Sequence, residues 1–236
     1  MEYIYETHLH TSPVSACGVS KPWDYAATYK KAGYAGFCIT NHFFNGNSGV
    51  DRSLPWKEQV DFYYEAYEQA LESAAVADVD VFFGIEYNFH GDEYLLYGVT
   101  KQWLYDHPDM MKYTHQELFD EMNKIGALMI QAHPYRKRDY IKEINLHPEC
   151  VHGLEVYNTC NKPEENDKAL ALAKEHGLLM TGGSDIHNVQ NAVSYIEDKS
   201  FLLSGVILPE RAGTVENFIR MIKEGRAKVR FGSQVI

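Results

Sequence analysis

The sequence has few cysteines, and they are not grouped as in a zinc ribbon or a disulfide framework. The four are Cys17, Cys38, Cys150 and Cys160, and none forms a CxxC pair. A ribbon-type zinc site and a disulfide-stapled fold are therefore not expected. Cys38 lies inside the apolar stretch GFCIT, which indicates a small core residue.

Long apolar runs and an excess of positive charge are also missing. No run reaches about 18 apolar residues, and the N-terminal MEYIYETHLH lacks the features of a signal peptide. We therefore expect a cytoplasmic protein with no membrane partner. Lys and Arg number 22 against 33 Asp and Glu, which argues against stable nucleic-acid binding. The net charge of −11 does not exclude a phosphate ester, because bound cations dominate the field of their own site.

The pattern of apolar residues predicts one α/β domain over residues 1–236, since no linker or low-complexity stretch divides the chain. Short apolar and β-branched runs indicate strands. They fall at about 3–8, 34–40, 79–86, 94–99, 127–132, 153–157, 178–182 and 201–207. Helical patterns lie between most of them, at 22–32, 57–77, 114–126, 163–177 and 214–225.

Alternating strands and helices of this kind predict βα units around a mostly parallel sheet. Thr114 and Glu117 form the clearest helix start, a capping box. Seven or eight strands in one domain favour a closed barrel over an open sheet. In such barrels the chemistry lies at the C-terminal ends of the strands.

Residues that bind metals recur at these predicted strand ends. Imidazoles and carboxylates are ligands of Zn, Mn and Fe, so their recurrence predicts a site with several metal ions. The predicted metal ligands are His8, His10, His42, Glu86, His133, Asp185 and His187.

Four of these residues form two pairs, and the two residues of each pair are spaced to lie on one face of a strand. His8 and His10 are two residues apart, so both side chains project to the same side, and Asp185 and His187 repeat this geometry. The residues between them, Leu9 and Ile186, should point away into apolar surroundings. A single His-x-His pair is more often a surface or core feature, and two such pairs favour metal binding.

The remaining ligand candidates each have a simpler interpretation. His42 and His133 could merely end strands, and Glu86 could pair with a Lys or Arg. A buried carboxylate needs a cation, and the excess of acidic residues favours a metal. The other histidines are expected at the surface. They include His107, His115, His147, His152 and His176.

Taken in order, the motifs ETHLHTSPVSACG, ITNH, GIEYN, AHPYR, GLEVYN and GGSDIH resemble the PHP (polymerase and histidinol phosphatase) superfamily. The chain is most similar to its stand-alone, histidinol-phosphatase-like members. This resemblance implies a distorted (β/α)7, TIM-like barrel with two or three divalent metal ions at the C-terminal strand ends. It also implies hydrolysis of phosphate esters.

The resemblance also implies how the ligands are shared among the ions, and where this chain departs from the family. His8, His10, Glu86 and Asp185 would hold one pair of ions, and His42, His133 and His187 would complete the cluster. The family usually has an Asp or His shortly after the first motif. Here the nearest candidate is Cys17, either a soft ligand that favours Zn or Fe or an unliganded loop thiol. A family histidine after the Glu86 position is replaced by Glu93 or Tyr94.

The favoured function is a metal-dependent phosphoesterase that acts on a small phosphorylated substrate, either a monoester or a diester. Two or three ions can activate a water and stabilise the leaving oxygen. Asp185 and Arg136 are the predicted catalytic residues, with Arg136 gripping a phosphate oxygen. Lys137 and Arg138 are alternatives, and the whole KRD segment could be a solvated basic loop. Glu155 matches a family carboxylate that could orient a ligating histidine.

Two other functions fit the same residues. One is an amidohydrolase-like barrel that cleaves a C–N bond, since such enzymes also begin with a His-x-His motif. The later GGSDIH and AHPYR motifs favour the PHP assignment over this one. The other is a non-catalytic metal-binding module, in which the altered ligand near Cys17 leaves a structural or sensing site.

Overall fold

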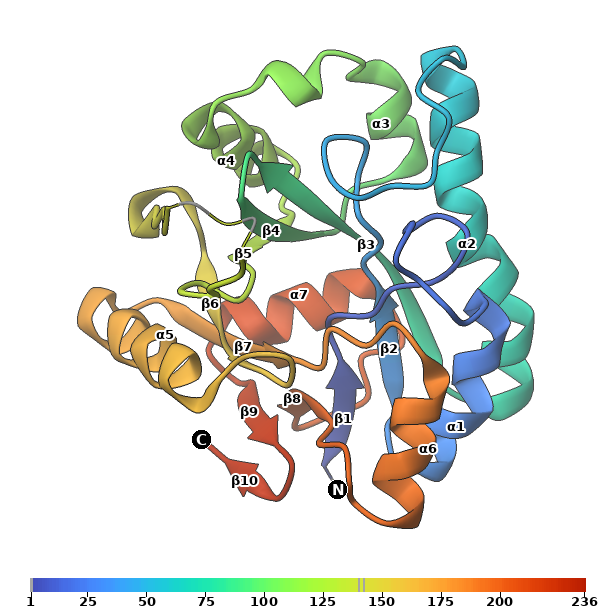
Figure 1. The fold of residues 1–236 in the computed structure, drawn as a ribbon, viewed down its shortest axis with the longest axis vertical. Helices are drawn as coiled ribbons and strands as arrows, with labels where there is room; N and C mark the ends of the chain where they lie inside the picture. The colour runs from blue at the N-terminus through green and yellow to red at the C-terminus, as the bar shows by residue number, and fades with distance from the viewer. Residues whose placement is uncertain (1, 140, 142) are drawn as a thin grey trace.

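The computed structural model describes residues 2–139, 141 and 143–236, which form a curved sheet with helices around it (Figure 1). In the described residues the sheet has ten strands in the order β10-β9-β8-β1-β2-β3-β4-β5-β6-β7. The strands are β1 Tyr3–Glu6, β2 Gly36–Ile39, β3 Asp80–Phe89, β4 Asp92–Tyr97, β5 Leu128–Gln131, β6 Gly153–Asn158, β7 Leu179–Gly183, β8 Ser204–Leu208, β9 Lys228–Phe231 and β10 Gln234–Val235.

The helices surround the sheet, with α1, α2 and α6 on one side of Figure 1 and α5 on the other. The helix that the capping box predicted is α4, and Thr114 and Glu117 make both bonds of that box. The α-helices are α1 Tyr25–Lys31, α2 Trp56–Ala77, α3 Lys101–Asp106, α4 His115–Lys124, α5 Pro163–His176, α6 Val189–Glu197 and α7 Val215–Lys223. Single 3-10 turns are η1 Pro22–Asp24, η2 Met110–Lys112 and η3 Pro148–Cys150.

The expectation of a mostly parallel sheet is wrong. The pairs β1–β2, β2–β3, β5–β6 and β6–β7 are parallel. The pairs β1–β8, β3–β4, β4–β5, β8–β9 and β9–β10 are antiparallel. The reason is local. β3 and β4 are joined by a short turn at His90 and Gly91, and such a link can connect only antiparallel strands.

The sheet is strongly curled, so that β7 lies beside β8 and β9 and the sheet forms a half-barrel. β7 and β8 are not neighbours in the hydrogen-bonded order, but the backbone N–H of Ser204 donates to the Ser184 hydroxyl at 2.9 Å. Gly182 lies so close to Val229 that an added Cβ would come within 2.7 Å of its side chain. The α/β class with a barrel-like sheet is confirmed, and the (β/α)7 count stays a prediction.

Aromatic side chains fill one part of the core, where α7 packs on the strands. The ring of Phe218 lies 5.5–5.8 Å from the rings of Tyr5, Phe82 and Tyr97, which belong to β1, β3 and β4. All four side chains are buried. Because residues from both ends of the chain meet here, this packing fixes the strands that carry the site.

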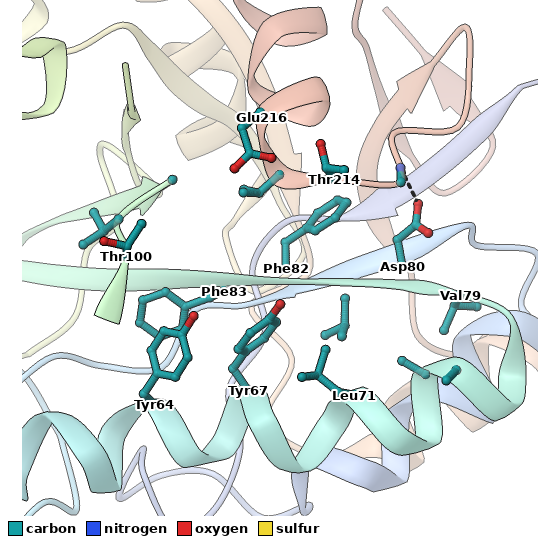
Figure 2. A pocket seen from close by; sticks show the side chains of 17 residues that line it. Tyr64, Tyr67, Leu71, Val79, Asp80, Phe82, Phe83, Thr100, Thr214 and Glu216 are labelled. Atoms are coloured by element: carbon teal, nitrogen blue, oxygen red, sulfur yellow. Dashed lines mark hydrogen bonds between the residues drawn. The ribbon is translucent and has the colours of Figure 1, made fainter. Parts of the chain in front are cut away.

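A groove of about 530 Å³ lies between α2, β3 and α7. Figure 2 shows Tyr64 and Tyr67 of α2 on one side of Phe83, with Glu216 of α7 across the groove. None of the predicted metal ligands lines it.

Within the described part of the chain, no helix combines the length and apolar character needed to cross a membrane.

Candidate metal centre

Glu86 lies at the centre of the predicted cluster, and its side chain is 1% exposed. Its Oε1 lies 3.0 Å from the Nε2 of His8 and 3.1 Å from the Nε2 of His133. Its Oε2 lies 2.5 Å from the Nδ1 of His42 and 3.4 Å from the Nε2 of His10. One carboxylate thus contacts histidines from three segments, which follow β1, β2 and β5.

The β3–β4 hairpin supplies a second carboxylate. Because β3 continues as this hairpin, Glu86 lies within the strand, and the expectation that it ends the strand is wrong. Glu93, near the start of β4, lies 3.7 Å from the Nδ1 of His42 and 3.4 Å from the Nε2 of His133. Tyr94, the other residue considered for this place, points elsewhere and its hydroxyl donates to Asp92.

Asp185 and His187 follow β7 and complete the cluster. The Oδ1 of Asp185 lies 3.1 Å from the Nε2 of His10 and 3.5 Å from the Nε2 of His8. The Nδ1 of His187 donates to the main-chain carbonyl of Asp185 at 2.8 Å, and its ring stacks on that of His10. The structure therefore brings all seven predicted ligands together. Leu9 and Ile186 are fully buried among apolar side chains, as predicted.

Hydrogen bonds at the far side of two rings fix which nitrogen faces the cluster. The Nδ1 of His8 donates to Glu155 at 3.0 Å. The Nδ1 of His10 lies 3.0 Å from the Ser15 hydroxyl, which donates its proton to Asn41 and so accepts from the ring. When both rings are neutral, their Nε2 atoms carry lone pairs that lie 3.1 Å apart and face carboxylates. Lone pairs that converge in this way need a cation between them.

Two further atoms lack a partner. The Nδ1 of His42 and the Oε2 of Glu86 are buried and make no hydrogen bond, although they lie 2.5 Å apart. Unsatisfied buried polar atoms are rare, and a bound ion would explain both. The donors also form overlapping groups whose ligand atoms lie within 4.8 Å of one another. These groups are His8–His10–Asp185, His8–Glu86–His133, His42–Glu86–Glu93 and His10–His42–His187. The residues present thus fit divalent metal ions.

The charges of the site favour a cation. The carboxylates of Glu86, Glu93, Glu155 and Asp185 lie in or beside the cluster, and Arg136 places a guanidinium beside Asp185. Burial alone would raise the pKa of Glu86 and Asp185, but the neighbouring histidines, and Arg136 beside Asp185, hold both pKa values well below the usual range. Both side chains are therefore anionic at neutral pH.

The same charges shift the pKa values of the histidines. Burial alone would lower the pKa of His8 and of His42, but the carboxylates outweigh it and raise both pKa values well above the usual value. A ring nitrogen whose pKa is raised in this way can bind a metal ion where the proton would otherwise be. For His10, burial and the neighbouring His42 lower the pKa to about 3, so its ring is neutral and ready to act as a ligand.

The backbone is strained at two of the predicted ligands. His133 has φ of 29° and Asp185 has φ of 54°, in the left-handed region that costs a non-glycine residue about 1–3 kcal/mol. The backbone N–H of His133 is held by a hydrogen bond to Glu155 at 2.9 Å. Such conformations persist only where the surroundings fix them, and here they turn both side chains into the cluster.

Above the cluster lies a cavity of about 530 Å³. Its volume suits a small molecule, and it is lined by polar side chains. The lining residues are Cys17, His42, Asn45, Gly46, Asn47, Glu86, Asn88, Glu93, Arg136, Asp185 and His187. A ligand in this cavity would therefore touch the predicted metal ligands directly.

Cys17 lies in the wall of this cavity and is partly exposed. Burial alone would raise the pKa of its thiol, but hydrogen bonds to His187 and His42 outweigh burial and lower the pKa to about 6. The residue at which the chain departs from the family pattern thus lines the same cavity as two predicted ligands, His42 and His187.

Arg136 is buried, with 9% of its surface exposed. Its Nη1 pairs with the Oδ2 of Asp185 at 2.7 Å, and its Nε and Nη2 donate to Asn161 and Asn158 at 2.8 Å each. It therefore holds Asp185 in place from the cavity wall. Neither Lys137 nor Arg138 lines the cavity.

Sequence reasoning missed Glu6, a buried carboxylate on β1. Its Oε1 accepts hydrogen bonds from the backbone N–H groups of His8 at 2.9 Å and Ser184 at 2.8 Å. Burial raises the pKa of Glu6 to about 7. This side chain joins the two loops that carry the His-x-His and Asp-x-His pairs. Its only sequence signal is a carboxylate two residues before His8 in an otherwise apolar strand.

The expectation of surface positions is wrong for some other histidines. His115 is half-buried, and its Nε2 lies 2.7 Å from Asp92. Its ring lies between those of Phe89 and His147, at 3.9 and 3.8 Å. The start of α4 packs on the β3–β4 hairpin, and this packing covers the ring.

The chain is similar to known proteins in one segment of its sequence and in its fold. A family model described as PHP-associated matches residues 163–191, which include α5, β7 and the GGSDIH motif. No curated protein matches the chain. Among solved structures, 14 chains match.

Three of these structures illustrate how similar the matching proteins are to this chain. A two-domain protein from Bacteroides vulgatus, which contains a predicted PHP-like metal-dependent phosphoesterase, has a TM-score of 0.69 and 19% identity, covering 100% of this chain and 66% of its own. A candidate metal-dependent phosphoesterase from Bifidobacterium adolescentis has a TM-score of 0.54 and 15% identity, covering 78% and 87%. An amidohydrolase from Chromobacterium violaceum has a TM-score of 0.51 and 13% identity, also covering 78% and 87%.

At these identities the structures show a shared fold. The chain spans just under two thirds of the Bacteroides vulgatus protein, the remainder of which has no counterpart here. The chain thus resembles the PHP superfamily in the order of its motifs, in the segment that the PHP-associated model matches and in its fold.

Proposed function

We propose that this protein is a metal-dependent hydrolase of a small phosphate ester. The observation that carries the proposal is the convergence of imidazole and carboxylate donors on Glu86, whose Oε2 is buried without a hydrogen-bond partner. This convergence forms the floor of a cavity of about 530 Å³. The residues that would hold two or three ions of Zn, Mn or Fe are His8, His10, His42, Glu86, His133, Asp185 and His187.

Divalent ions bound there would supply an acidified water and positive charge for the ester oxygens. The chain's own residues prepare the site for this chemistry. Glu155 and Ser15 fix the rings of His8 and His10, so that their Nε2 atoms face inward. Arg136 holds Asp185 and lines the cavity, where its remaining N–H groups can bind a phosphate oxygen.

Polar groups in the cavity wall suit a phosphorylated substrate with hydroxyl or amino groups. Asn45, Asn47 and Asn88 line the cavity beside Arg136. Amide side chains can donate to phosphate oxygens and accept from hydroxyl groups. This chemistry supports a small, polar substrate.

An amidohydrolase-like activity is the second candidate, because one structure of the same fold belongs to a protein with that name. A non-catalytic metal-binding module is the third. The two enzyme hypotheses differ in the product that they release, and the third predicts no product at all.

A product assay on metal-loaded protein tests the proposal. Protein stripped with a chelator and reloaded with Zn²⁺, Mn²⁺ or Fe²⁺ should release inorganic phosphate from members of a panel of sugar, amino-alcohol and nucleoside phosphates. A parallel panel of amides and cyclic C–N substrates measures the second candidate. Full metal occupancy with no phosphate released from any ester would contradict the proposal.

Two matched variants complete the assay. Asp185→Asn removes a buried charge from the cluster and should abolish phosphate release. Asp198→Asn, the same substitution at an exposed position after α6, should leave the release unchanged. Equal activity in both variants would place the chemistry elsewhere.

A further inference from the structure

A second group of metal-binding residue types lies outside the cluster, on the other face of the β3–β4 hairpin. One carboxylate oxygen of Asp92 and one ring nitrogen each of His115 and His147 lie within 4.8 Å of one another. We call these three residues the hairpin site. They come from β4, from the start of α4 and from the loop before η3, so the fold brings together three segments that are distant in sequence.

Asp92 supplies the carboxylate of the hairpin site. Asp92 and Glu93 are consecutive residues of β4, and consecutive side chains of a strand point to opposite faces. Glu93 faces the cluster, 3.4 Å from the Nε2 of His133, whereas the Oδ2 of Asp92 lies 2.7 Å from the Nε2 of His115. The same Oδ2 accepts from the Tyr94 hydroxyl at 2.8 Å, and Asp92 is buried. The carboxylate is therefore fixed in orientation.

The two imidazoles are stacked beside this carboxylate. The ring of His115 lies 3.8 Å from that of His147 and 3.9 Å from that of Phe89 on its other side. Two protonated rings at this distance would repel each other, so the stack is favourable when at least one ring is neutral. A neutral imidazole has a lone pair that can bind a metal ion. One ion could thus neutralise Asp92 without a proton on both rings.

The loop that carries His147 is held by a buried side chain at the end of β5. The Nε2 of Gln131 donates to the carbonyl of Asn145 at 2.7 Å, and its Oε1 accepts from the backbone N–H of His147 at 3.4 Å. The side-chain amide of Asn145 in turn donates to the Oδ1 of Asp92 at 3.5 Å. These contacts hold His147 near Asp92 before any ion binds, which lowers the entropic cost of binding.

Solvent and charge both allow a cation to enter. The side chains of His115 and His147 are 24% and 30% exposed, so an ion can reach the rings and keep a water ligand. A second carboxylate lies close, since the Oε1 of Glu149 is 3.4 Å from the Nδ1 of His147. The positive end of the α4 dipole opposes a cation, but Glu117 places a negative charge at the same end, where it accepts from the backbone N–H of Thr114.

We propose that Asp92, His115 and His147 bind one Zn²⁺ ion, which links the β3–β4 hairpin to α4 and to the loop before η3. Two imidazoles and one carboxylate are a ligand set of Zn²⁺, whereas Mg²⁺ and Mn²⁺ prefer oxygen ligands. Because two of the three ligands are half-exposed, this ion should bind more weakly than those of the cluster. The inference goes beyond the proposed function and needs no phosphate release to be true.

Nuclear magnetic resonance of the histidine rings tests the site residue by residue. Stripped protein with ¹⁵N-labelled histidine is titrated with Zn²⁺, and the variants His115→Gln and His147→Gln assign the two signals. The ring nitrogens of His115 and His147 should both shift on zinc binding, after those of the cluster ligands. The ring of His176, exposed at the end of α5, should not shift. Unchanged signals of His115 and His147 in excess Zn²⁺ would overturn the inference.

Zinc content gives a second test. Equilibrium dialysis followed by elemental analysis should find one Zn²⁺ fewer per chain in His147→Gln and in Asp92→Asn than in the wild type. His176→Gln, the matched control, should bind as many ions as the wild type. Circular dichroism checks the fold, and His147→Gln changes a half-exposed side chain that should not be needed for folding. Wild-type zinc content in folded His147→Gln would reduce the hairpin site to an ion pair with a stacked ring.

The outcomes also separate this inference from the proposed function. A zinc-dependent shift at His147 in a protein that releases no phosphate supports the hairpin site and contradicts the phosphoesterase proposal. Phosphate release by a protein whose His115 and His147 rings do not respond to Zn²⁺ supports the phosphoesterase proposal and overturns the hairpin site.

Discussion

Glu155 accepts a hydrogen bond from the Nδ1 of His8 at 3.0 Å, and this single contact turns the other ring nitrogen of His8 toward Glu86. The second carboxylate oxygen of Glu155 accepts from the backbone N–H of His133 at 2.9 Å. Glu155 is fully buried and lies behind the predicted ligands. It therefore positions two of them without facing the cavity itself.

Replacing this carboxylate should weaken metal binding. Glu155→Gln keeps the volume but removes the charge that holds the Nδ1 proton of His8. Loss of such a partner typically reduces metal affinity by about 10–100-fold. Isothermal titration of the stripped protein with Zn²⁺ measures the effect. Glu164→Gln, the same substitution at an exposed position in α5, is the control and should bind Zn²⁺ as the wild type does.

Metal removal should destabilise the fold, because metal ions then no longer bridge the buried carboxylates and imidazoles, and protons on His8 and His42 have to replace them. Addition of Zn²⁺ at about 100 times its Kd should raise the free energy of unfolding by about 2.7 kcal/mol. Thermal unfolding with and without chelator measures the difference. Glu86→Gln changes the central ligand of the cluster, so most of the zinc-dependent stabilisation should be lost in this variant. An equal shift in wild type and variant would contradict the assignment.

Gly183 is predicted to tolerate no side chain. A Cβ there would lie 2.4 Å from the Cβ of His8 and 2.5 Å from the Oε1 of Glu155. Gly183→Ala should therefore lower the free energy of unfolding by about 1–3 kcal/mol, the usual cost of overpacking, and should also weaken zinc binding. Urea denaturation and zinc titration measure the two effects.

The control for this substitution is Gly46→Ala. A Cβ at Gly46 would meet its nearest neighbour, the Cβ of His42, at 3.5 Å, which is an ordinary contact. The variant should keep both stability and zinc affinity. If Gly183→Ala behaved like Gly46→Ala, the close packing behind His8 would not be needed for metal binding.

The predicted site residues could be found from sequence because each follows a recognisable apolar run. Strand ends of one sheet meet at one edge, so residues as distant as His8 and Asp185 could be expected together. Their supporting contacts could not be predicted in this way. Glu6 and Ser184 are 178 residues apart, and only the folded sheet places the carboxylate of one at the backbone N–H of the other.

The direction of the strands was the part of the fold that sequence did not specify. A buried strand such as β4 or β8 has the same apolar pattern whichever way it runs, so the pattern gave its position but not its antiparallel pairing. β9, with the sequence KVRF, was missed because its charged residues alternate with apolar ones, and β10, the edge strand beside it, has only two residues. Such strands carry little of the apolar signal on which the predictions depend.

His152, a histidine remote from the cluster, should make the stability of the fold depend on pH. His152 accepts a hydrogen bond from the backbone N–H of Met129 at its Nδ1, and its Nε2 lies 3.0 Å from the side-chain oxygen of Asn123. This arrangement requires a neutral ring with its proton on Nε2. Burial, together with the charge of Lys223, lowers the pKa of His152 from 6.5 to about 4. Protonation would break the bond to β5.

Because the pKa is lower in the folded state, the unfolded chain takes up the proton first as the pH falls. The contribution of neutral His152 to stability should therefore be complete above pH 6.5 and should decrease as the pH falls through about 4. His152→Asn keeps an acceptor for Met129 but cannot titrate, so its urea midpoint should depend less on pH between these values. His176→Asn, at an exposed position, should keep the wild-type pH dependence. Parallel curves for wild type and His152→Asn would show that the His152 ring does not sense pH in this range.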